Sequence, residues 1–211
     1  MKIAIIGAGP SGLMASIQAS KGNHDIHLFD SNDRIGKKLF ITGKGRCNLT
    51  NSRPIEEFID EYHHQKYFLY SALYTFNNLD LIEFFNSRRV PMTSEQGQRV
   101  FPKSQKSSDI IKALEREVNT SNIKLRLKQT INKVDYVSNK FVLNTNDGNE
   151  TFDACVIATG GASYPATGSN GLGYKLASSL GHPIIQTRSA LCGIEMNEVN
   201  PNLQGLSLKN T

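Results

Sequence analysis

With 211 residues, the chain is long enough for one compact α/β domain with an appendage, and its 38% hydrophobic and 20% charged residues are ordinary for a soluble globular protein. No apolar run approaches the roughly 20 residues of a membrane-spanning helix, so we expect no membrane association. The net charge of +5 comes without a basic tract interleaved with aromatic residues, which argues against a nucleic-acid partner.

The three cysteines contain no C-x-x-C pair, which argues against a disulfide framework and against a structural zinc site. We therefore expect no bound metal and a reducing, cytoplasmic environment.

The chain begins with a pattern typical of a dinucleotide site. Residues 3–6 predict a buried strand, residues 10–22 a helix, and residues 24–29 a second strand. The first turn reads G-A-G-P-S-G, and the second strand ends at Asp30, whose carboxylate would accept a hydrogen bond from a ribose hydroxyl. A strand, a glycine turn, a helix and an acidic residue in this order are the fingerprint of a Rossmann fold.

The three glycines of the turn have separate steric functions. We expect Gly7 to make the tight turn, Gly9 to let a pyrophosphate approach the backbone, and Gly12 to let the helix pack on the strand. The helix begins at Pro10 or Ser11, so its free N–H groups and the positive end of its dipole would face the phosphates. A dinucleotide is the predicted ligand.

Residues 34–53 follow as a long, loop-like segment with six cations and no acidic residue. Near the cofactor, these cations would neutralise the pyrophosphate, attract an anionic substrate or stabilise an anionic reduced ring, and the alternative is a solvated basic loop. Arg46 would favour a thiolate at Cys47. A thiol relay needs a second cysteine, however, so packing or cofactor contact is the favoured role of Cys47.

The middle of the chain, about residues 55–105, predicts an insertion of helices and a hairpin. Residues 55–64 and 67–85 have helical apolar spacing, and residues 90–102 predict a hairpin. His63 and His64 are adjacent and so do not form a metal pair. We expect the bulky stripe of the second helix to pack in the core: Phe68, Leu69, Leu73, Phe76, Leu79, Leu81, Ile82, Phe84 and Phe85.

After the insertion, a helix over about residues 110–118 is predicted, capped by Ser107, Ser108 or Asp109. Three strand-like runs over 130–137, 140–145 and 150–157 then predict a small antiparallel meander. The last run leads into a second glycine-rich turn, A-T-G-G-A-S, which we expect to form another edge of the cofactor cleft. The predicted fold is thus α/β: a Rossmann-like, FAD/NAD(P)-binding parallel sheet with helices on both faces and a small β-meander.

Three motifs carry a resemblance to a known family: G-A-G-P-S-G with Asp30, G-K-K-L-F-I-T-G-K-G-R-C-N-L-T-N, and A-T-G-G-A-S-Y-P-A-T-G-S-N-G-L-G-Y-K-L-A. The chain resembles the bacterial NAD(P)/FAD-dependent oxidoreductases of the aminoacetone oxidase type, which are two-dinucleotide-binding-domain flavoproteins. That family more usually has Glu at the position of Asp30 and Gly at the position of Lys44.

The resemblance implies FAD as cofactor, with the first glycine turn on the pyrophosphate and Asp30 on the adenosine ribose. It places Val134 at the adenine, and Lys38 and the segment from Arg46 to Asn48 near the flavin. The cofactor-binding residues it implies are Gly7, Gly9, Pro10, Ser11, Gly12, Asp30, Lys38, Arg46, Cys47, Asn48, Val134, Thr159, Gly160 and Gly161. No residue is predicted to be catalytic, since the flavin would supply the redox chemistry.

The family also implies a longer chain in which a second, largely β domain is inserted. We expect residues 1–195 to form the FAD-binding domain and residues 196–211 to begin the inserted one, so the chain resembles a truncated N-terminal portion with weakened FAD retention and little turnover. The predicted function is an FAD-dependent oxidoreductase that transfers hydride to the flavin from a small organic substrate, such as an amine or aminoketone. The alternatives are an NAD(P)-dependent reductase and an inactive nucleotide-binding fragment. The substrate, electron acceptor and oligomeric state are not predicted.

Overall fold

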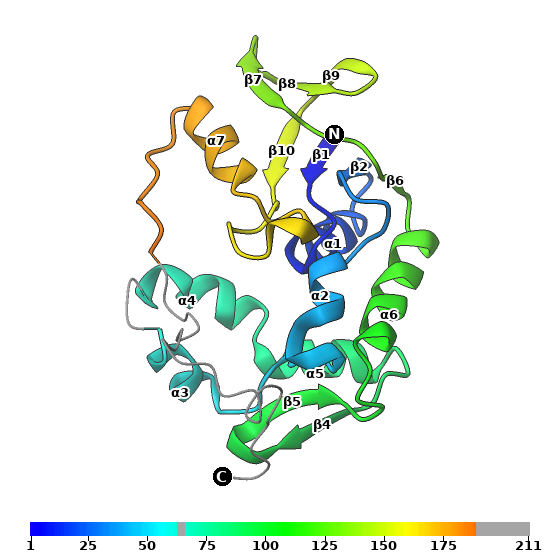
Figure 1. The fold of residues 1–211 in the computed structure, drawn as a ribbon, viewed down its shortest axis with the longest axis vertical. Helices are drawn as coiled ribbons and strands as arrows, with labels where there is room; N and C mark the ends of the chain where they lie inside the picture. The colour runs from blue at the N-terminus through cyan, green and yellow to red at the C-terminus, as the bar shows by residue number, and fades with distance from the viewer. Residues whose placement is uncertain (63–65, 189–211) are drawn as a thin grey trace, which may run out of the picture.

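A computed structural model describes residues 1–62 and 66–188 of the chain. Its centre is a four-stranded, fully parallel sheet in the order β10-β1-β2-β6 (Figure 1). The strands are β1 (Lys2–Ile6), β2 (Asp25–Phe29), β6 (Ile123–Arg126) and β10 (Ala154–Ile157). In the register of the sheet, Ile5 of β1 lies between Leu28 of β2 and Val156 of β10. The predicted Rossmann sheet is confirmed.

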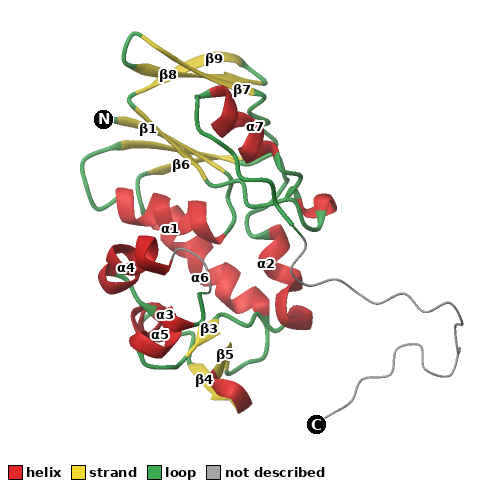
Figure 2. Cartoon of the chain, turned by 90° about the vertical axis from the view of Figure 1, so that its left-hand side faces the viewer, coloured by secondary structure: helices red, strands yellow, loops and turns green. Residues whose placement is uncertain are grey.

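The two faces of the sheet bury different sets of side chains, because successive residues of a strand point to opposite faces. Ile5 belongs to the core shared with helices α1 (Pro10–Ala19) and α6 (Ser107–Thr120). Ala4 and Ile6 belong to the core on the other face, with helix α7 (Leu172–Ser179) and the meander. Figure 2 shows α1 and α6 on one side of the sheet and α7 with the meander on the other.

The meander consists of β7 (Lys133–Val137), β8 (Lys140–Thr145) and β9 (Gly148–Phe152), paired antiparallel in that order. The single strand predicted over 150–157 is wrong, because the chain changes sheets at Asp153. The N–H of Asp153 donates to the carbonyl of Lys2, and its carboxylate accepts from the N–H of Lys2 at 2.6 Å. These bonds direct residues 154–157 alongside β1, where they form β10.

The basic segment after β2 contains more regular structure than the predicted loop. Residues Lys37–Ile41 form helix α2, residues Thr42–Gly45 a 3-10 turn, and residues Thr50–Asn51 the short strand β3. Helix α2 forms because Leu39 is buried in the core beneath α6. Lys44 lies in the left-handed region at φ 56°, a conformation that favours glycine, which is the residue more usual in the resembling family.

A lobe of short elements follows: α3 (Ile55–Asp60), α4 (Lys66–Thr75), α5 (Asn78–Asn86), β4 (Met92–Glu95) and β5 (Arg99–Pro102). The predicted hairpin is confirmed as the antiparallel pair β4 and β5, and β3 extends it to three strands. The helix predicted over 67–85 is two helices, because the side chain of Asn77 accepts from the N–H groups of Leu79 and Asp80 and starts α5 there.

The predicted packing of the bulky stripe in the core is confirmed for Leu81, Phe84 and Phe85 of α5. It is wrong for Leu79 of α5, which is 50% exposed, and for α4. Phe85 is 2% exposed and packs in the core, whereas α4 contains no buried residue and Phe68 is 83% exposed. Among the described residues, α4 packs mainly on α3, which leaves its aromatic face uncovered.

The N-terminus of α6 also differs from the prediction. The preceding residue is Lys106, and no side chain caps the helix. Ser107 is instead the first helical residue, and its buried hydroxyl donates to the carbonyl of Phe40 at 2.8 Å, which ties α6 to the end of α2.

Three predictions fall on parts of the chain outside the described residues. They concern His63 and His64, the inserted domain predicted to begin at residue 196, and Cys192, one of the three cysteines for which neither a disulfide framework nor a zinc site is expected. Within residues 1–62 and 66–188, none of the helices combines the length and the apolar composition needed to span a bilayer.

Candidate dinucleotide-binding site

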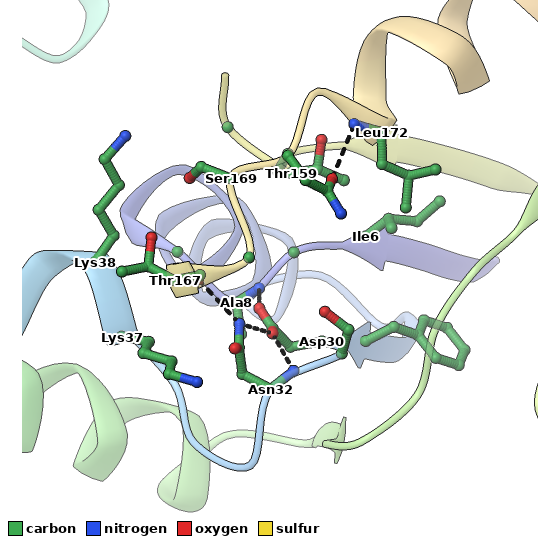
Figure 3. A pocket seen from close by; sticks show the side chains of 18 of the residues that line it. Ile6, Ala8, Asp30, Asn32, Lys37, Lys38, Thr159, Thr167, Ser169 and Leu172 are labelled. Carbon is green, nitrogen blue, oxygen red and sulfur yellow. Dashed lines mark hydrogen bonds between the residues drawn. The ribbon is translucent and has the colours of Figure 1, made fainter. Parts of the chain in front are cut away.

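A cavity of about 270 Å³ lies where the carboxyl ends of β1, β2 and β10 meet (Figure 3). Ligands of open α/β sheets bind at this edge, in the crevice outside the strand ends. The loops that follow the three strands supply 11 of its 24 lining residues: Gly7 to Ser11, Asp30 to Asn32, and Ala158 to Gly160. Residues Gln129 to Ile131, before the meander, also line it. Lys37, Lys38 and residues Thr167 to Asn170 complete the rim.

The glycine turn forms the floor of this cavity, and its glycines have different surroundings. Gly7 adopts φ +108°, and a Cβ there would lie 2.5 Å from the carbonyl oxygen of Ala158. A Cβ on Gly12 would overlap the carbonyl oxygen of Gly7. A Cβ on Gly9, in contrast, would meet nothing within 4 Å. Gly7 and Gly12 are therefore needed by the fold, whereas Gly9 leaves open space in the cavity wall.

Helix α1 begins at this open space without a cap. Gly9 is the residue that precedes the helix, Pro10 is its first residue, and no side chain accepts a hydrogen bond from its first turn. The helical bonds start with the N–H of Leu13, which donates to Gly9 O at 2.9 Å. The earlier amides, those of Ser11 and Gly12, have no acceptor within the helix, and such groups bind anions.

The carboxylate of Asp30 holds the glycine turn in place. Its Oδ2 accepts from the N–H of Ala8 at 2.7 Å, and its Oδ1 accepts from both the N–H and the side-chain Nδ2 of Asn32 at 2.8 Å (Figure 3). A carboxylate offers about four acceptor positions, so one position is left for a ligand hydroxyl. Asp30 can thus fix the turn and still bind a ribose.

Two side chains connect the segment after β2 with the loop after β10, across the cavity. Asn32 Nδ2 donates to Thr167 O at 3.2 Å, and Lys38 Nζ donates to Ser163 Oγ at 2.6 Å and Ser163 O at 3.1 Å. Asn32 was not among the predicted site residues. Its only signal in the sequence is its place two residues after Asp30, where an amide can hydrogen-bond back to the carboxylate.

The structure brings eight of the predicted site residues together around the cavity: Gly7, Gly9, Pro10, Ser11, Asp30, Lys38, Thr159 and Gly160. The other six do not line it. Gly12 packs against the turn, Val134 is buried in the core of the meander, and Gly161 lies beside Tyr174. Arg46, Cys47 and Asn48 follow α2, beyond the cavity wall.

A thiolate at Cys47, which was the disfavoured alternative, is contradicted by the surroundings of the side chain. The side chain is fully buried in the core, and burial raises the pKa of its thiol. The Arg46 guanidinium is committed elsewhere: its Nη1 lies 3.1 Å from Glu95 Oε2 and donates to Gln105 Oε1 at 2.9 Å. Cys47 therefore packs in the core, which is one of the two favoured expectations, and its contact with a cofactor stays a prediction.

The family model of the HI0933-like protein Rossmann domain matches residues 1–209. The chain belongs to this family. Its matched region includes both glycine turns and the whole described cavity, so the site lies inside the family's own domain.

Two curated relatives of this HI0933-like chain are enzymes by name. The 3-dehydro-bile acid delta(4,6)-reductase of Clostridium scindens is 31% identical over 202 residues, which are 93% of this chain and 48% of that protein. The ribosomal RNA dihydrouridine synthase of Haemophilus influenzae is 29% identical over 208 residues, which are 96% of this chain and 51% of that protein. The chain thus spans about half the length of the curated relatives it matches.

Among solved structures, the open conformation of a flavocytochrome c3 fumarate reductase superposes with a TM-score of 0.58. It is 19% identical, and the match covers 85% of this chain and 40% of that one. This HI0933-like chain therefore shares the fold of the matched part of that protein.

Proposed function

We propose that the chain is the FAD-binding part of a flavin-dependent oxidoreductase. The observation that carries the proposal is the uncapped start of α1 at Gly9, where the cavity wall has room for a pyrophosphate. The residues present fit the cofactor, because the free amide of Ser11 at the cavity suits the pyrophosphate and Asp30 retains an acceptor position for the ribose. The cavity of about 270 Å³ is slightly smaller than the roughly 300–1,000 Å³ of small-molecule sites, so the described residues suit part of a dinucleotide.

The cations on the rim would have separate roles. Lys37 lines the cavity and makes no ion pair with any described residue, so it is available to neutralise a phosphate. Lys38 is already bonded to Ser163 and would chiefly hold the rim in place. When bound, the flavin would supply two-electron redox chemistry.

An NAD(P)-dependent reductase is the alternative for the same fingerprint. The Asp30 carboxylate would repel the 2′-phosphate of NADP, but it accepts a ribose hydroxyl of FAD and of NAD equally well. Our preference for FAD rests on the second and third sequence motifs, which are typical of the resembling flavoprotein family and which a minimal nicotinamide fingerprint does not require.

The cofactor proposal is tested by adding FAD to the purified chain, removing the excess by gel filtration and recording the absorbance. Retained oxidised flavin gives bands at about 370 and 450 nm. Asp30→Asn places an amide NH₂ where a carboxylate oxygen accepts from an N–H group, so we expect flavin retention to fall at least tenfold. The matched control is Asp33→Asn, on an exposed residue outside the cavity, and this variant should retain flavin as the wild type does. Retention of NAD but not of FAD by the wild-type chain would refute the proposal.

The direction of the reaction has two candidates. The resemblance suggests oxidation of a small amine or aminoketone in the cytoplasm. The names of the two relatives instead suggest reduction of an unsaturated substrate, a steroid or a nucleobase. Both relatives are about twice as long as this chain, so either activity is proposed for a longer protein that contains it. Hydrogen peroxide formed with aminoacetone under air supports oxidation. Anaerobic reoxidation of the photoreduced flavin at about 450 nm by an unsaturated steroid ketone or a uridine oligonucleotide supports reduction.

A further inference from the structure

A second cavity, of about 180 Å³, lies on the outer side of the lobe, away from the glycine turn. It is a surface cavity lined by the segment that follows α5, the loop after β5 and the solvent face of α6. It shares no lining residue with the first cavity. Its lining consists of Arg89, Val90, Pro91, Ser104, Asp109, Lys112 and Arg116.

The three cations of this cavity are not neutralised by the described residues. Arg89 and Lys112 form no side-chain hydrogen bond or ion pair there, and Arg116 donates only to the carbonyl of Arg88 at 3.1 Å. The neighbouring Arg88, in contrast, is neutralised by an ion pair and packs on an aromatic ring, as an arginine with a structural role does. Its Nη2 lies 2.9 Å from Glu117 Oε2, and its guanidinium lies over the ring of Phe84. Asp109 is the single acid of the lining, so the cavity carries a net positive charge.

The backbone at Arg89 has a conformation that is unusual for an arginine, although eight other described non-glycine residues also have positive φ. The residue lies just after the end of α5 at φ +61°, and its N–H donates to Asn86 O at 3.1 Å. Helix ends of this left-handed kind favour glycine or asparagine, because a larger side chain strains the backbone. An arginine here costs stability, yet it brings a guanidinium to the cavity.

We propose that this cavity binds the phosphate group of a phosphorylated small molecule. Guanidinium groups bind phosphate oxygens in a bidentate manner, and two of them with an ammonium group and the Ser104 hydroxyl provide donors from several directions. Asp109 supplies an acceptor for a hydroxyl on the body of the ligand. The small volume, of about 180 Å³, suits one phosphate group better than an extended nucleic-acid backbone. This inference does not depend on the proposed flavin.

The test is a titration of the ¹⁵N-labelled protein with inorganic phosphate at constant ionic strength, followed by amide chemical shifts. We expect saturable shifts at Arg89, Ser104 and Lys112 with a Kd in the millimolar range, about 1 mM. These shifts are read separately from any at Gly9 and Ser11, which report phosphate in the first cavity. Chloride at the same ionic strength serves as the control for screening.

The variant Arg89→Gln/Arg116→Gln should weaken this binding at least tenfold, and Lys112→Gln alone should weaken it less. The matched control is Lys103→Gln, which removes an exposed cation beside Ser104 that does not line the cavity. The proposal is overturned if phosphate causes no saturable shift at these residues, or if the double variant binds as the wild type does. Tighter binding at this cavity of a single-stranded oligonucleotide without terminal phosphates would overturn it in favour of nucleic acid.

Flavin retention by the double variant keeps the two proposals apart. We expect Arg89→Gln/Arg116→Gln to retain FAD as the wild type does, because neither residue lines the first cavity. Loss of phosphate binding with FAD retained supports this site, whatever the reaction of the protein proves to be.

Discussion

Helices α1 and α4 have the same length and similar apolar content, yet they differ completely in burial. Leu13 and Ile17 of α1 are buried, whereas Tyr67 and Phe68 of α4 are 77% and 83% exposed. In α1 the flanking strands β1 and β2 form a sheet that covers the apolar face. Apolar periodicity thus predicts which face of a helix can be buried, but burial also requires a surface beside it.

The N-termini of α1 and α5 give a second contrast between the sheet domain, which contains α1, and the lobe, which contains α4 and α5. Asn77 and Asp80 form a reciprocal capping box at the start of α5, so its first amides are satisfied within the chain. Gly9 provides no such acceptor at the start of α1. A helix that satisfies its own N-terminus serves the fold, whereas one that leaves it open beside a cavity is suited to an anionic ligand.

The largest expected effect tests the difference between a covered and an uncovered helix. It comes from truncating one phenylalanine of α5 and one of α4, the two helices of the predicted stripe. Phe85→Ala should lower the free energy of unfolding by about 3–5 kcal/mol, because it leaves a cavity in the core. Phe68→Ala should change it by about 0.5 kcal/mol or less, since the ring is exposed. Urea denaturation followed by circular dichroism measures both values.

A large loss of stability in Phe68→Ala would mean that α4 is covered in solution. The control is to measure the difference in stability between Phe68→Ala and the wild type at high and at low protein concentration. A difference that disappears at low concentration would mean that self-association covers α4.

A somewhat smaller effect separates the structural glycines of the pocket from the open one. Gly12→Val should destabilise by about 3 kcal/mol, because its side chain collides with the Gly7 carbonyl. Gly9→Ala, at φ −79° with no atom within reach of its Cβ, should stay within about 0.5 kcal/mol. Thermal unfolding of the two variants side by side provides the measurement. Equal destabilisation by both would show that the cavity wall at Gly9 is closed.

The central βαβ unit could be predicted from the sequence because each of its signals is local. The run before Gly7, the glycine spacing and Asp30 act on neighbouring residues, and the structure places these features together as expected. The meander was predictable for the same reason, since turn residues separate its strands.

Long-range packing is what the sequence did not show. Helix α2 depends on Leu39 reaching the core beneath α6, and the division of 150–157 depends on Asp153 bonding to Lys2. Cys47 illustrates the same limit in the site: the adjacent Arg46 suggested a thiolate, but the guanidinium turns to Glu95 and Gln105, far along the chain. Which partner a charge finds is decided by tertiary structure.

The sheet also contains a group that should make its stability depend on pH. His27 is buried beside the rings of Phe29 and Phe152, and burial lowers its pKa below the usual 6.5 although the nearby Asp25 opposes the change. Below pH 6.5 the unfolded chain binds a proton that the folded chain does not. Stability should therefore be lost as the pH falls from 6.5, with a slope from this group of at most about 1.4 kcal/mol per pH unit.

Urea denaturation midpoints recorded between pH 7 and pH 5 measure how the free energy of unfolding changes with pH. The variant His27→Gln should show a smaller dependence than the wild type. Asp25→Asn is the matched change: without the carboxylate that favours the charged ring, the pKa of His27 falls further and the loss continues to lower pH. An unchanged slope in His27→Gln would assign the pH dependence to other groups.

The smallest of these effects concerns the contrast between the two helix N-termini. Asn77→Ala removes the acceptor for the N–H groups of Leu79 and Asp80, at 2.8 and 2.9 Å, and should cost about 1 kcal/mol of stability. Asn77→Asp keeps the acceptor and should restore most of that loss.

In α1 the corresponding change is Gly9→Asp, which adds an acceptor beside open amides and should leave stability unchanged or slightly raised. The same change should abolish FAD retention, because the new carboxylate occupies the space proposed for the pyrophosphate and repels it. If Gly9→Asp retained the flavin, the open amides of α1 would not be the phosphate site, and the difference between the two helix starts would be only a matter of capping.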